Sequence, residues 1–179
     1  MFTTIDWDDI MYHYQTGEEV RSGDEIEYSE WGGIVEFIIN PGSNEASDYS
    51  VPNGGVMLLF FTGGRVLLDT TDEEEDLVFV QRFNDSIPAK FEKYGQLCKM
   101  CYADGSPLLA GDEVELCRGD GSVCKAQVIA VYPPFEKSSW EVQMPTGGVL
   151  LDIEGGSKIR CDKIPSSMQK SLRTKCSVK

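Results

Sequence analysis

The stretch Pro52-Asn53-Gly54-Gly55-Val56-Met57-Leu58 returns later in the chain as Pro145-Thr146-Gly147-Gly148-Val149-Leu150-Leu151. Further upstream the two copies match at a constant offset of 88, where Tyr14, Gly17, Val20, Gly23, Asp24, Glu25, Ile26 and Glu27 correspond to Tyr102, Gly105, Leu108, Gly111, Asp112, Glu113, Val114 and Glu115. Each copy closes with a glycine pair, at 63–64 and 155–156. A chain of 179 residues with this repeat is expected to contain two domains of roughly 80–90 residues, each large enough to bury its own core.

Short apolar runs with polar residues between them, ending at glycine or proline, are the pattern of β-strands in both copies. In the first copy we expect strands at 25–28, 34–39, 55–61, 65–68 and 77–80, with turns at 31–33 and 63–64. In the second copy we expect them at 107–109, 112–116, 126–132, 140–144, 148–153 and 157–160. No run of helical period lies among these strands, so the sequence predicts an all-β fold of two small tandem antiparallel barrels.

The repeat also sets the expected boundaries. We expect an acidic N-terminal domain at 1–82, a linker at 83–97, a C-terminal domain at 98–165 and a basic tail at 166–179. The linker is a short helix or a loop, with Ser86 as a possible helix cap and Pro88 in the first turn. It contains enough apolar residues to pack against its neighbours.

The two copies differ more in net charge than in their pattern of apolar and polar residues. The chain has 16 basic and 30 acidic residues, a net charge of -14, and residues 1–90 carry -15 of it against +1 for residues 91–179. Such a balance opposes binding to phosphates, so nucleic acid is not an expected ligand. The asymmetry indicates one scaffold presenting two different surfaces, although solubility alone is the simpler interpretation.

Membrane association and secretion are not expected. No apolar run approaches the ~20 residues that a membrane-spanning helix needs, and the start of the chain lacks the basic and apolar regions of a secretory signal. All six cysteines lie in the second half, so the copies share no disulfide framework. A reducing cytoplasm is the expected location.

Catalytic and metal-binding patterns are weak. Cys98 and Cys101 form a single C-x-x-C pair without a second pair at zinc spacing, so we expect free thiols and neither metal nor cofactor. His13 is the only histidine, and its counterpart is Cys101, so a Ser-His-Asp or Cys-His arrangement would have to use this one residue. The sequence therefore predicts a protein that is not an enzyme.

The candidate partner-binding residues are acidic and aromatic. The acidic run between two predicted strands contains Asp69, Asp72, Glu73, Glu74, Glu75 and Asp76, and predicted loops add Glu18, Glu19, Glu45 and Asp48. An anionic loop of this kind could enter a basic cleft and accelerate encounter by electrostatic steering. The aromatic candidates, at turns or strand starts, are Trp31, Tyr49 and Trp140. The alternatives are a solvated acidic loop and rings that cap their own core.

The segments Gly23-Asp24-Glu25-Ile26, Gly33-Ile34-Val35 and Gly111-Asp112-Glu113-Val114 resemble those of Src-homology-3-like barrels of the translation-factor and ribosomal-protein type. That resemblance implies the barrel fold for both copies. It does not carry over the RNA ligand, because those barrels are basic and the first copy here is acidic.

The overall layout, with two such copies and the Gly-Gly-Val-x-Leu element in an acidic chain, resembles immunity proteins found beside secreted toxins of Gram-negative bacteria, including type VI secretion effectors. The resemblance implies stoichiometric binding that occludes a toxin's active site. The acidic charge of the first copy favours a basic toxin, such as a nuclease, as the partner. The competing interpretation is a general protein- or peptide-binding adaptor that uses its aromatic residues. The sequence leaves open whether the protein is a monomer or a homodimer.

Overall fold

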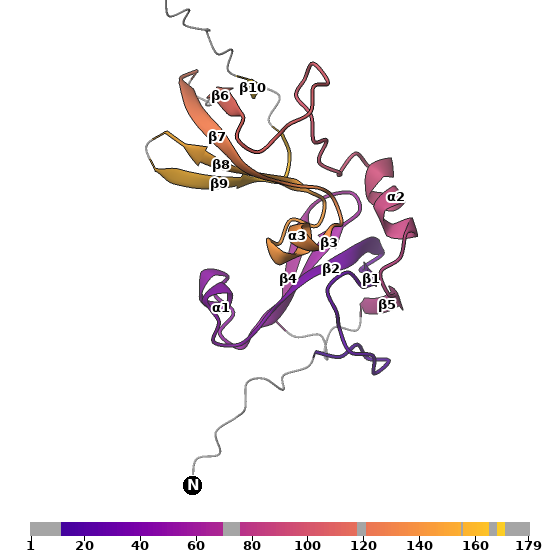
Figure 1. Ribbon diagram of the computed structural model, residues 1–179. Helices are drawn as coiled ribbons and strands as arrows, with labels where there is room; N and C mark the ends of the chain where they lie inside the picture. Colours follow the sequence, from indigo (N-terminus) through magenta and orange to yellow (C-terminus); the bar gives the residue numbers. More distant parts are fainter. Residues whose placement is uncertain (1–11, 70–75, 118–120, 155, 165–167, 171–179) are drawn as a thin grey trace, which may run out of the picture. The chain divides into compact units, whose positions relative to one another are not determined.

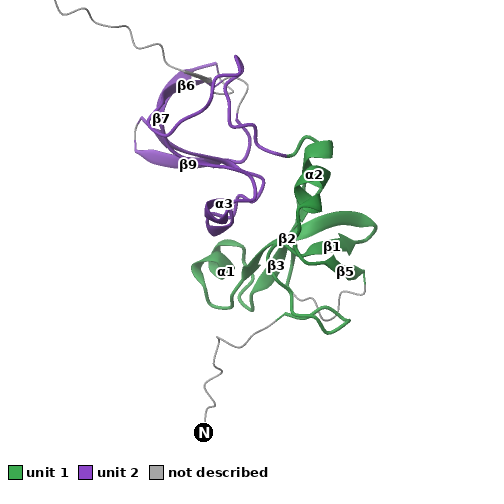
Figure 2. Ribbon diagram, turned by 45° about the vertical axis from the view of Figure 1, so that its right-hand side comes forward, with its two compact units in different colours: residues 1–96 green, residues 97–179 purple. Residues whose placement is uncertain are grey.

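The computed structural model describes residues 12–69, 76–117, 121–154, 156–164 and 168–170, and the chain divides into two compact units, Met1–Gln96 and Leu97–Lys179 (Figure 2). Each unit holds one antiparallel sheet of five strands in its described part (Figure 1). The structure is mostly β, which confirms the all-β prediction. Segment 83–97, expected to be a linker, lies almost entirely within the first unit.

Unit 1 contains five strands and two short helices. The strands are β1 (Glu25–Tyr28), β2 (Trp31–Ile39), β3 (Gly55–Phe60), β4 (Arg65–Leu68) and β5 (Leu77–Gln81), and they lie side by side in the order β4-β3-β2-β1-β5. Helix α1 (Asn44–Asp48) connects β2 to β3, and helix α2 (Ser86–Lys93) follows β5.

Unit 2 follows the same plan. Its strands are β6 (Glu113–Cys117), β7 (Val123–Tyr132), β8 (Gly148–Ile153), β9 (Ser157–Cys161) and β10 (Gln169–Lys170), in the order β10-β6-β7-β8-β9. Helix α3 (Lys137–Glu141) connects β7 to β8, as α1 connects β2 to β3. The irregularities match as well, because the register shifts between Val35 and Phe37 in β2 and between Val128 and Ala130 in β7.

The Pro-x-Gly-Gly stretch recurs because both units need its glycines at the start of β3 and β8. Gly54 and Gly147 have φ angles of 83° and 85°, a conformation that glycine adopts without steric cost. A Cβ on Gly54 would lie 2.5 Å from the carbonyl oxygen of Ile39, and one on Gly147 would lie 2.9 Å from that of Tyr132. Both contacts are too close for a Cβ atom. The same close approach of the backbone therefore requires glycine at the equivalent position of each unit.

Each unit has its own core on one face of its sheet. In unit 1 this core is built from Tyr14, Val20, Ile26, Val35, Val56, Leu58, Phe60, Leu68 and Leu77. In unit 2 it is built from Tyr102, Leu108, Val114, Leu116, Ala126, Val128, Val149, Leu151 and Met168. Most members are counterparts in the repeat, so the shared sequence pattern is chiefly a shared core.

Helix α2 covers the opposite face of the unit 1 sheet. Ile87 and Phe91, one helical turn apart, are fully buried, and the Phe91 ring meets that of Phe61 at 4.9 Å in an edge-on arrangement. The predicted cap at Ser86 is wrong. The N-cap residue is Asp85, and the backbone N–H of Ser86 donates to the side-chain oxygen of Asn84 at 2.9 Å.

Two predicted features of unit 1 are corrected. The turn expected at 31–33 lies at Ser29 and Glu30, and Trp31 is already paired with Tyr28 in the sheet. Residues 44–48, expected in a loop, form α1, where the Ser43 hydroxyl oxygen accepts from the backbone N–H of Ala46 at 3.1 Å. A helix of five residues is too short to show a periodic apolar pattern, so the pattern of apolar residues does not predict it.

Two predicted strands of unit 2 are wrong as well. Residues 140–144 begin inside α3 instead of forming a strand, and residues 107–109 contribute only an isolated bridge between Pro107 and Cys101. Gln143, which follows α3, has a φ angle of 58°, as does the equivalent Ser50 after α1 at 59°. The left-handed residue ends each short helix and turns the chain toward the Pro-x-Gly-Gly stretch.

Candidate partner-binding surface

A tyrosine–aspartate pair anchors the start of both units. The Tyr14 hydroxyl donates to the Asp24 carboxylate at 3.1 Å, and the Tyr102 hydroxyl donates to Asp112 at 2.9 Å. The same carboxylates accept a backbone N–H three residues upstream, from Arg21 at 2.8 Å and from Leu109 at 3.0 Å. Since both units keep this arrangement, these residues hold the scaffold together and are poor candidates for a function specific to one unit.

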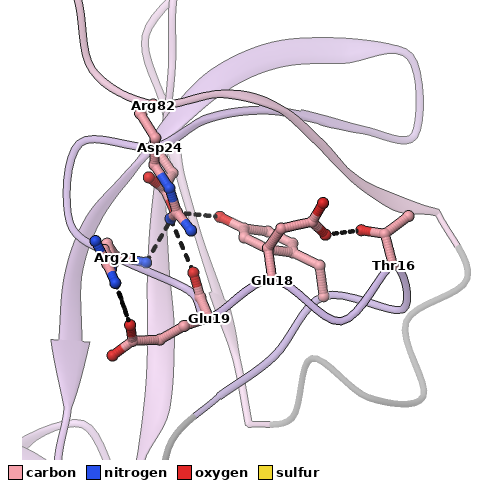
Figure 3. A network of polar contacts seen from close by, with 7 residues as sticks. Thr16, Glu18, Glu19, Arg21, Asp24 and Arg82 are labelled. Carbon is pink, nitrogen blue, oxygen red and sulfur yellow. Dashed lines mark hydrogen bonds and ion pairs between the residues drawn. The ribbon is translucent and has the colours of Figure 1, made fainter.

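In unit 1 the Asp24 carboxylate of this pair also binds the guanidinium of Arg82. Arg82, just after β5, donates to the Asp24 carboxylate at 2.5 Å and to the backbone oxygen of Glu19 at 2.8 Å (Figure 3). Asp24 is buried, with 1 % of its surface exposed. Burial and the neighbouring Asp24 carboxylate raise the pKa of Tyr14 well above its ordinary value, so this hydroxyl stays protonated and remains a donor.

Glu18 and Glu19, two of the predicted acidic residues, lie beside this network. The Thr16 hydroxyl donates to the Glu18 carboxylate, and the Arg21 guanidinium donates to Glu19 at 2.6 Å (Figure 3). These hydrogen bonds lower the pKa values of both carboxyl groups, so both stay ionised. Arg21 offsets the charge of Glu19, so Glu18 contributes more than Glu19 to a negative surface.

Asp69 and Asp76, the two ends of the acidic run 69–76, belong to the described residues. Asp69 follows β4 and is exposed. Burial raises the pKa of the Tyr12 hydroxyl, and the negative charge of Asp69 raises it further. Asp76 precedes β5, and its carboxylate accepts from the Ser29 hydroxyl at 3.2 Å. Asp72, Glu73, Glu74 and Glu75 lie outside the described residues.

Three further predicted residues gather on α1. Glu45 and Asp48 are exposed on this helix, and Tyr49 ends it with 42 % of its surface exposed. The Tyr49 ring lies 5.8 Å from that of Phe37 on β2. Ala46 faces inward and packs with Phe37, Ile39 and Met57. The helix therefore joins two exposed acids to an exposed aromatic ring.

Trp31 is the first residue of β2 and directly follows the β1–β2 turn. It has 56 % of its surface exposed, while its other side lies against Phe60 of the core, with ring centroids 6.4 Å apart. Both sequence interpretations of this ring therefore apply in part, because it contacts the edge of the core and is also exposed. Ser29, in the turn that precedes Trp31, donates to the Asp76 carboxylate, so Asp76 lies beside the hairpin that carries Trp31.

Trp140 differs from the other two aromatic candidates. It lies within α3, is half-buried and meets the Phe135 ring at 6.2 Å. The adjacent Ser139 is fully buried, and its hydroxyl donates to the backbone oxygen of Pro133. Trp140 therefore helps to close the connection between β7 and β8.

The described residues contain no constellation that points to catalysis or metal binding. No three histidine, cysteine or acidic side chains among them gather in a group that could hold a metal ion. His13 forms a bridge with Glu19 in the first turn of unit 1. Cys98 is buried, and burial raises its pKa to about 11, which keeps the thiol protonated and unreactive at neutral pH.

An open groove of about 480 Å³ lies on unit 2, lined by Glu113, Lys125, Gln127, Asp152 and Glu154 together with the backbone beside them. Glu113, Lys125, Gln127 and Asp152 lie in neighbouring register on β6, β7 and β8, on the face of the sheet opposite the core, and Glu154 directly follows β8. Sequence reasoning did not single them out, because alternating polar residues are typical of any solvated sheet face.

Two ion pairs of unit 1 were also missed. Arg65 of β4 binds both carboxylate oxygens of Glu36 at 2.6 and 2.9 Å, and Lys90 of α2 binds Glu25 of β1 at 2.5 Å. Glu36 occupies the bulge of β2, and its side chain is fully buried. The partners are 29 and 65 positions apart, so no local sequence pattern predicts these pairs. The only indication in the sequence is that Glu36 and Glu25 are acidic residues within apolar strands.

Comparisons with protein-family models, with curated proteins and with solved structures found no match. None of the helices in the described part of the chain has the length and apolar character needed to cross a membrane.

Proposed function

We propose that this chain is a non-catalytic binding protein, most specifically a cytoplasmic immunity protein that binds and neutralises a basic bacterial toxin such as a nuclease. The charge contrast between two similar units carries the proposal. Residues 1–90 hold a net charge of -15 and residues 91–179 hold +1, although the two sheets share one strand order. Folding alone does not require such a difference, whereas a basic partner for one unit accounts for it.

We also propose that each sheet curls into a Src-homology-3-like barrel. The matched strand order, the matched bulges in β2 and β7 and the short helix between the second and third strands of each unit support this. A bulge increases local twist and bends a strand, which is how small sheets close.

The exposed acids of unit 1 supply the means of recognition. Glu18, Glu45, Asp48, Asp69 and Asp76 lie at or near the surface of this unit. A surface of one sign attracts an oppositely charged protein over several ångströms and raises the association rate, with an effect that salt screens. The acidic run 69–76 adds charge within the same unit.

The test begins with the tagged full chain purified at low salt from cells that make it. We expect one basic protein to co-purify in stoichiometric amount. Its association rate constant should fall steeply with ionic strength, and the variant Glu73→Gln/Glu74→Gln/Glu75→Gln should lower that rate by roughly tenfold at low salt. The matched control Glu136→Gln/Glu141→Gln/Glu154→Gln removes three charges from unit 2 and should leave the rate within twofold. Equal effects of the two variants would remove the acidic unit from the proposal.

A general adaptor is the second candidate, and the exposure of Trp31 and Tyr49 favours it. An adaptor that binds through aromatic side chains should associate at a rate nearly independent of salt and should recover several partners of mixed charge. That result would replace the immunity proposal.

A further inference from the structure

The β1–β2 hairpin of unit 1 makes an unusual turn. Ser29 and Glu30 link the paired residues Tyr28 and Trp31, and both have positive φ angles, 47° and 72°. A two-residue hairpin turn of this kind favours asparagine followed by glycine, since other residues are strained there. The sequence instead places two side chains that cost stability at this site, so the side chains themselves need an explanation.

The Ser29 side chain has an evident structural role. Its hydroxyl donates to the Asp76 carboxylate at 3.2 Å, and its backbone N–H donates to the Asp76 backbone oxygen at 3.4 Å. These contacts tie the turn to the residue that precedes β5, so the hairpin is held at its tip. Glu30 has no such contact in the described structure and is exposed.

Trp31 adds a large apolar surface at the same place. Among the large apolar side chains exposed in the described residues, Trp31, Leu109 and Val123 have the highest exposure, 56 % each. A tryptophan at this exposure presents far more area than a leucine or a valine. The Phe60 ring contacts one side of the indole, with centroids 6.4 Å apart, and so restricts its position before any partner binds. A fixed exposed aromatic ring is the usual form of a binding hot spot.

Unit 2 does not reproduce the arrangement. Its corresponding hairpin continues the pairing to Cys117 and Val123, and the register places Cys124 where unit 1 has Trp31. The two units otherwise share their core and their polar anchors. The tip of the β1–β2 hairpin is therefore a feature of unit 1 that the common scaffold does not require.

We propose that Trp31 is the apolar anchor of the unit 1 binding surface, and that it enters an apolar pocket ringed by lysine or arginine side chains of a basic protein, with Glu30 and Asp76 facing that ring. This inference rests on the proposed function, and it names the contact through which binding occurs. The partner chemistry follows from the hairpin, because an indole ring needs an apolar pocket and the two flanking carboxylates need cations.

Site-specific photocrosslinking in the full chain tests the contact. p-Benzoylphenylalanine is placed at Trp31, at Asp76, at Glu18 and, as the control, at Val123, which is also 56 % exposed but lies in the hairpin of unit 2. After irradiation in cells that make the protein, we expect one crosslinked basic protein at positions 31 and 76 and none at 123. Crosslinks at 18 or 76 without one at 31 would overturn the anchor and leave the proposed function standing. Crosslinks at none of the positions would overturn both.

The protein captured at position 31 then serves as the probe for affinity. Trp31→Ala should raise the Kd by about 30-fold or more, and Glu30→Gln should raise it by about 3-fold at low salt and have no effect at high salt. Val123→Ala should leave the Kd within 2-fold. Because Trp31 touches Phe60, Trp31→Phe keeps a ring at the edge of the core and separates lost binding from lost folding. A Kd unchanged by Trp31→Ala in a folded protein would overturn the proposal.

Discussion

Replacing Arg65 with methionine should destabilise unit 1 strongly, because it removes the cation that binds a buried carboxylate. The Glu36 side chain has 0 % of its surface exposed, and Arg65 donates to its two oxygens at 2.6 and 2.9 Å. Removing one partner of a buried ion pair costs about 3–5 kcal/mol. The Arg65 side chain is 39 % exposed, so water reaches the vacated site and lowers the expected cost to about 2–3 kcal/mol.

The chain contains its own control for this prediction. The repeat and the strand register place Lys158 of β9 where unit 1 has Arg65, opposite Asp152 in place of Leu59. Lys158 is exposed, so Lys158→Met should change the free energy of unfolding by less than about 0.5 kcal/mol. At the bulge itself unit 2 has Ile129 in place of Glu36. The double variant Glu36→Ile/Arg65→Met should therefore recover at least half of the stability lost in Arg65→Met.

Urea denaturation measures the loss, and hydrogen exchange of peptides from β3 and β8 shows which unit is affected. Two units need not unfold together, so a single transition is not assumed. Arg65→Met should increase exchange in β3 and leave β8 unchanged. A cost below about 0.5 kcal/mol, or a double variant less stable than Arg65→Met, would refute the assignment of Glu36 as a buried charge that depends on Arg65.

Three further predictions follow from the features that the units share and from the thiols. Gly54→Ala should cost roughly 2–4 kcal/mol in thermal unfolding, because the φ angle of 83° is strained for alanine and the new Cβ would lie 2.5 Å from a carbonyl oxygen; an unchanged Tm would contradict the close approach. Tyr102→Phe should cost about 1.5–3 kcal/mol by urea denaturation, since it removes a hydrogen bond to the Asp112 carboxylate, and a loss in unit 1 instead of unit 2 would be inconsistent with this pairing. The pKa of Cys98 is raised by burial to about 11, so the folded state holds this proton more tightly than the unfolded state and stability is fully present below about pH 8.5. The free energy of unfolding should fall as the pH rises from there toward 11, and a Cys98→Ala variant whose stability falls equally steeply would show that other groups are responsible.

Much of the fold was predictable because comparing the two copies of the repeat shows which residues recur. A residue that recurs at the same offset serves the scaffold, as Tyr14 and Tyr102 do in binding their aspartates. The turn of the first hairpin was misplaced because Gly32 and Gly33 resemble turn residues. Gly33 instead lies inside β2, where a Cβ would approach the carbonyl oxygen of Leu59 to 2.6 Å. Glycine is required there by the neighbouring strand, which the sequence alone does not reveal.

The candidate surface was less predictable, because it depends on which residues meet across the fold. The sequence identified Trp31 and Asp76 separately, and the structure joins them through Ser29, which no spacing rule connects. The same reasoning put Trp140 at a strand start, whereas a helix of five residues holds it half-buried. Elements this short take their structure from the tertiary packing around them more than from local propensity.

The outer face of the sheet differs in composition between the two units. In unit 1 this face carries Ile34 and Leu59, both buried, and α2 lies over it with Lys90 bound to Glu25. In unit 2 the register places Gln127 and Asp152 at the corresponding positions, beside an exposed Glu113. Apolar residues there would leave a sheet face exposed to water at a cost of about 25 cal/mol for each Å² of apolar surface. The composition of each outer face thus matches its surroundings, with apolar residues beneath α2 in unit 1 and polar residues around the open groove of unit 2.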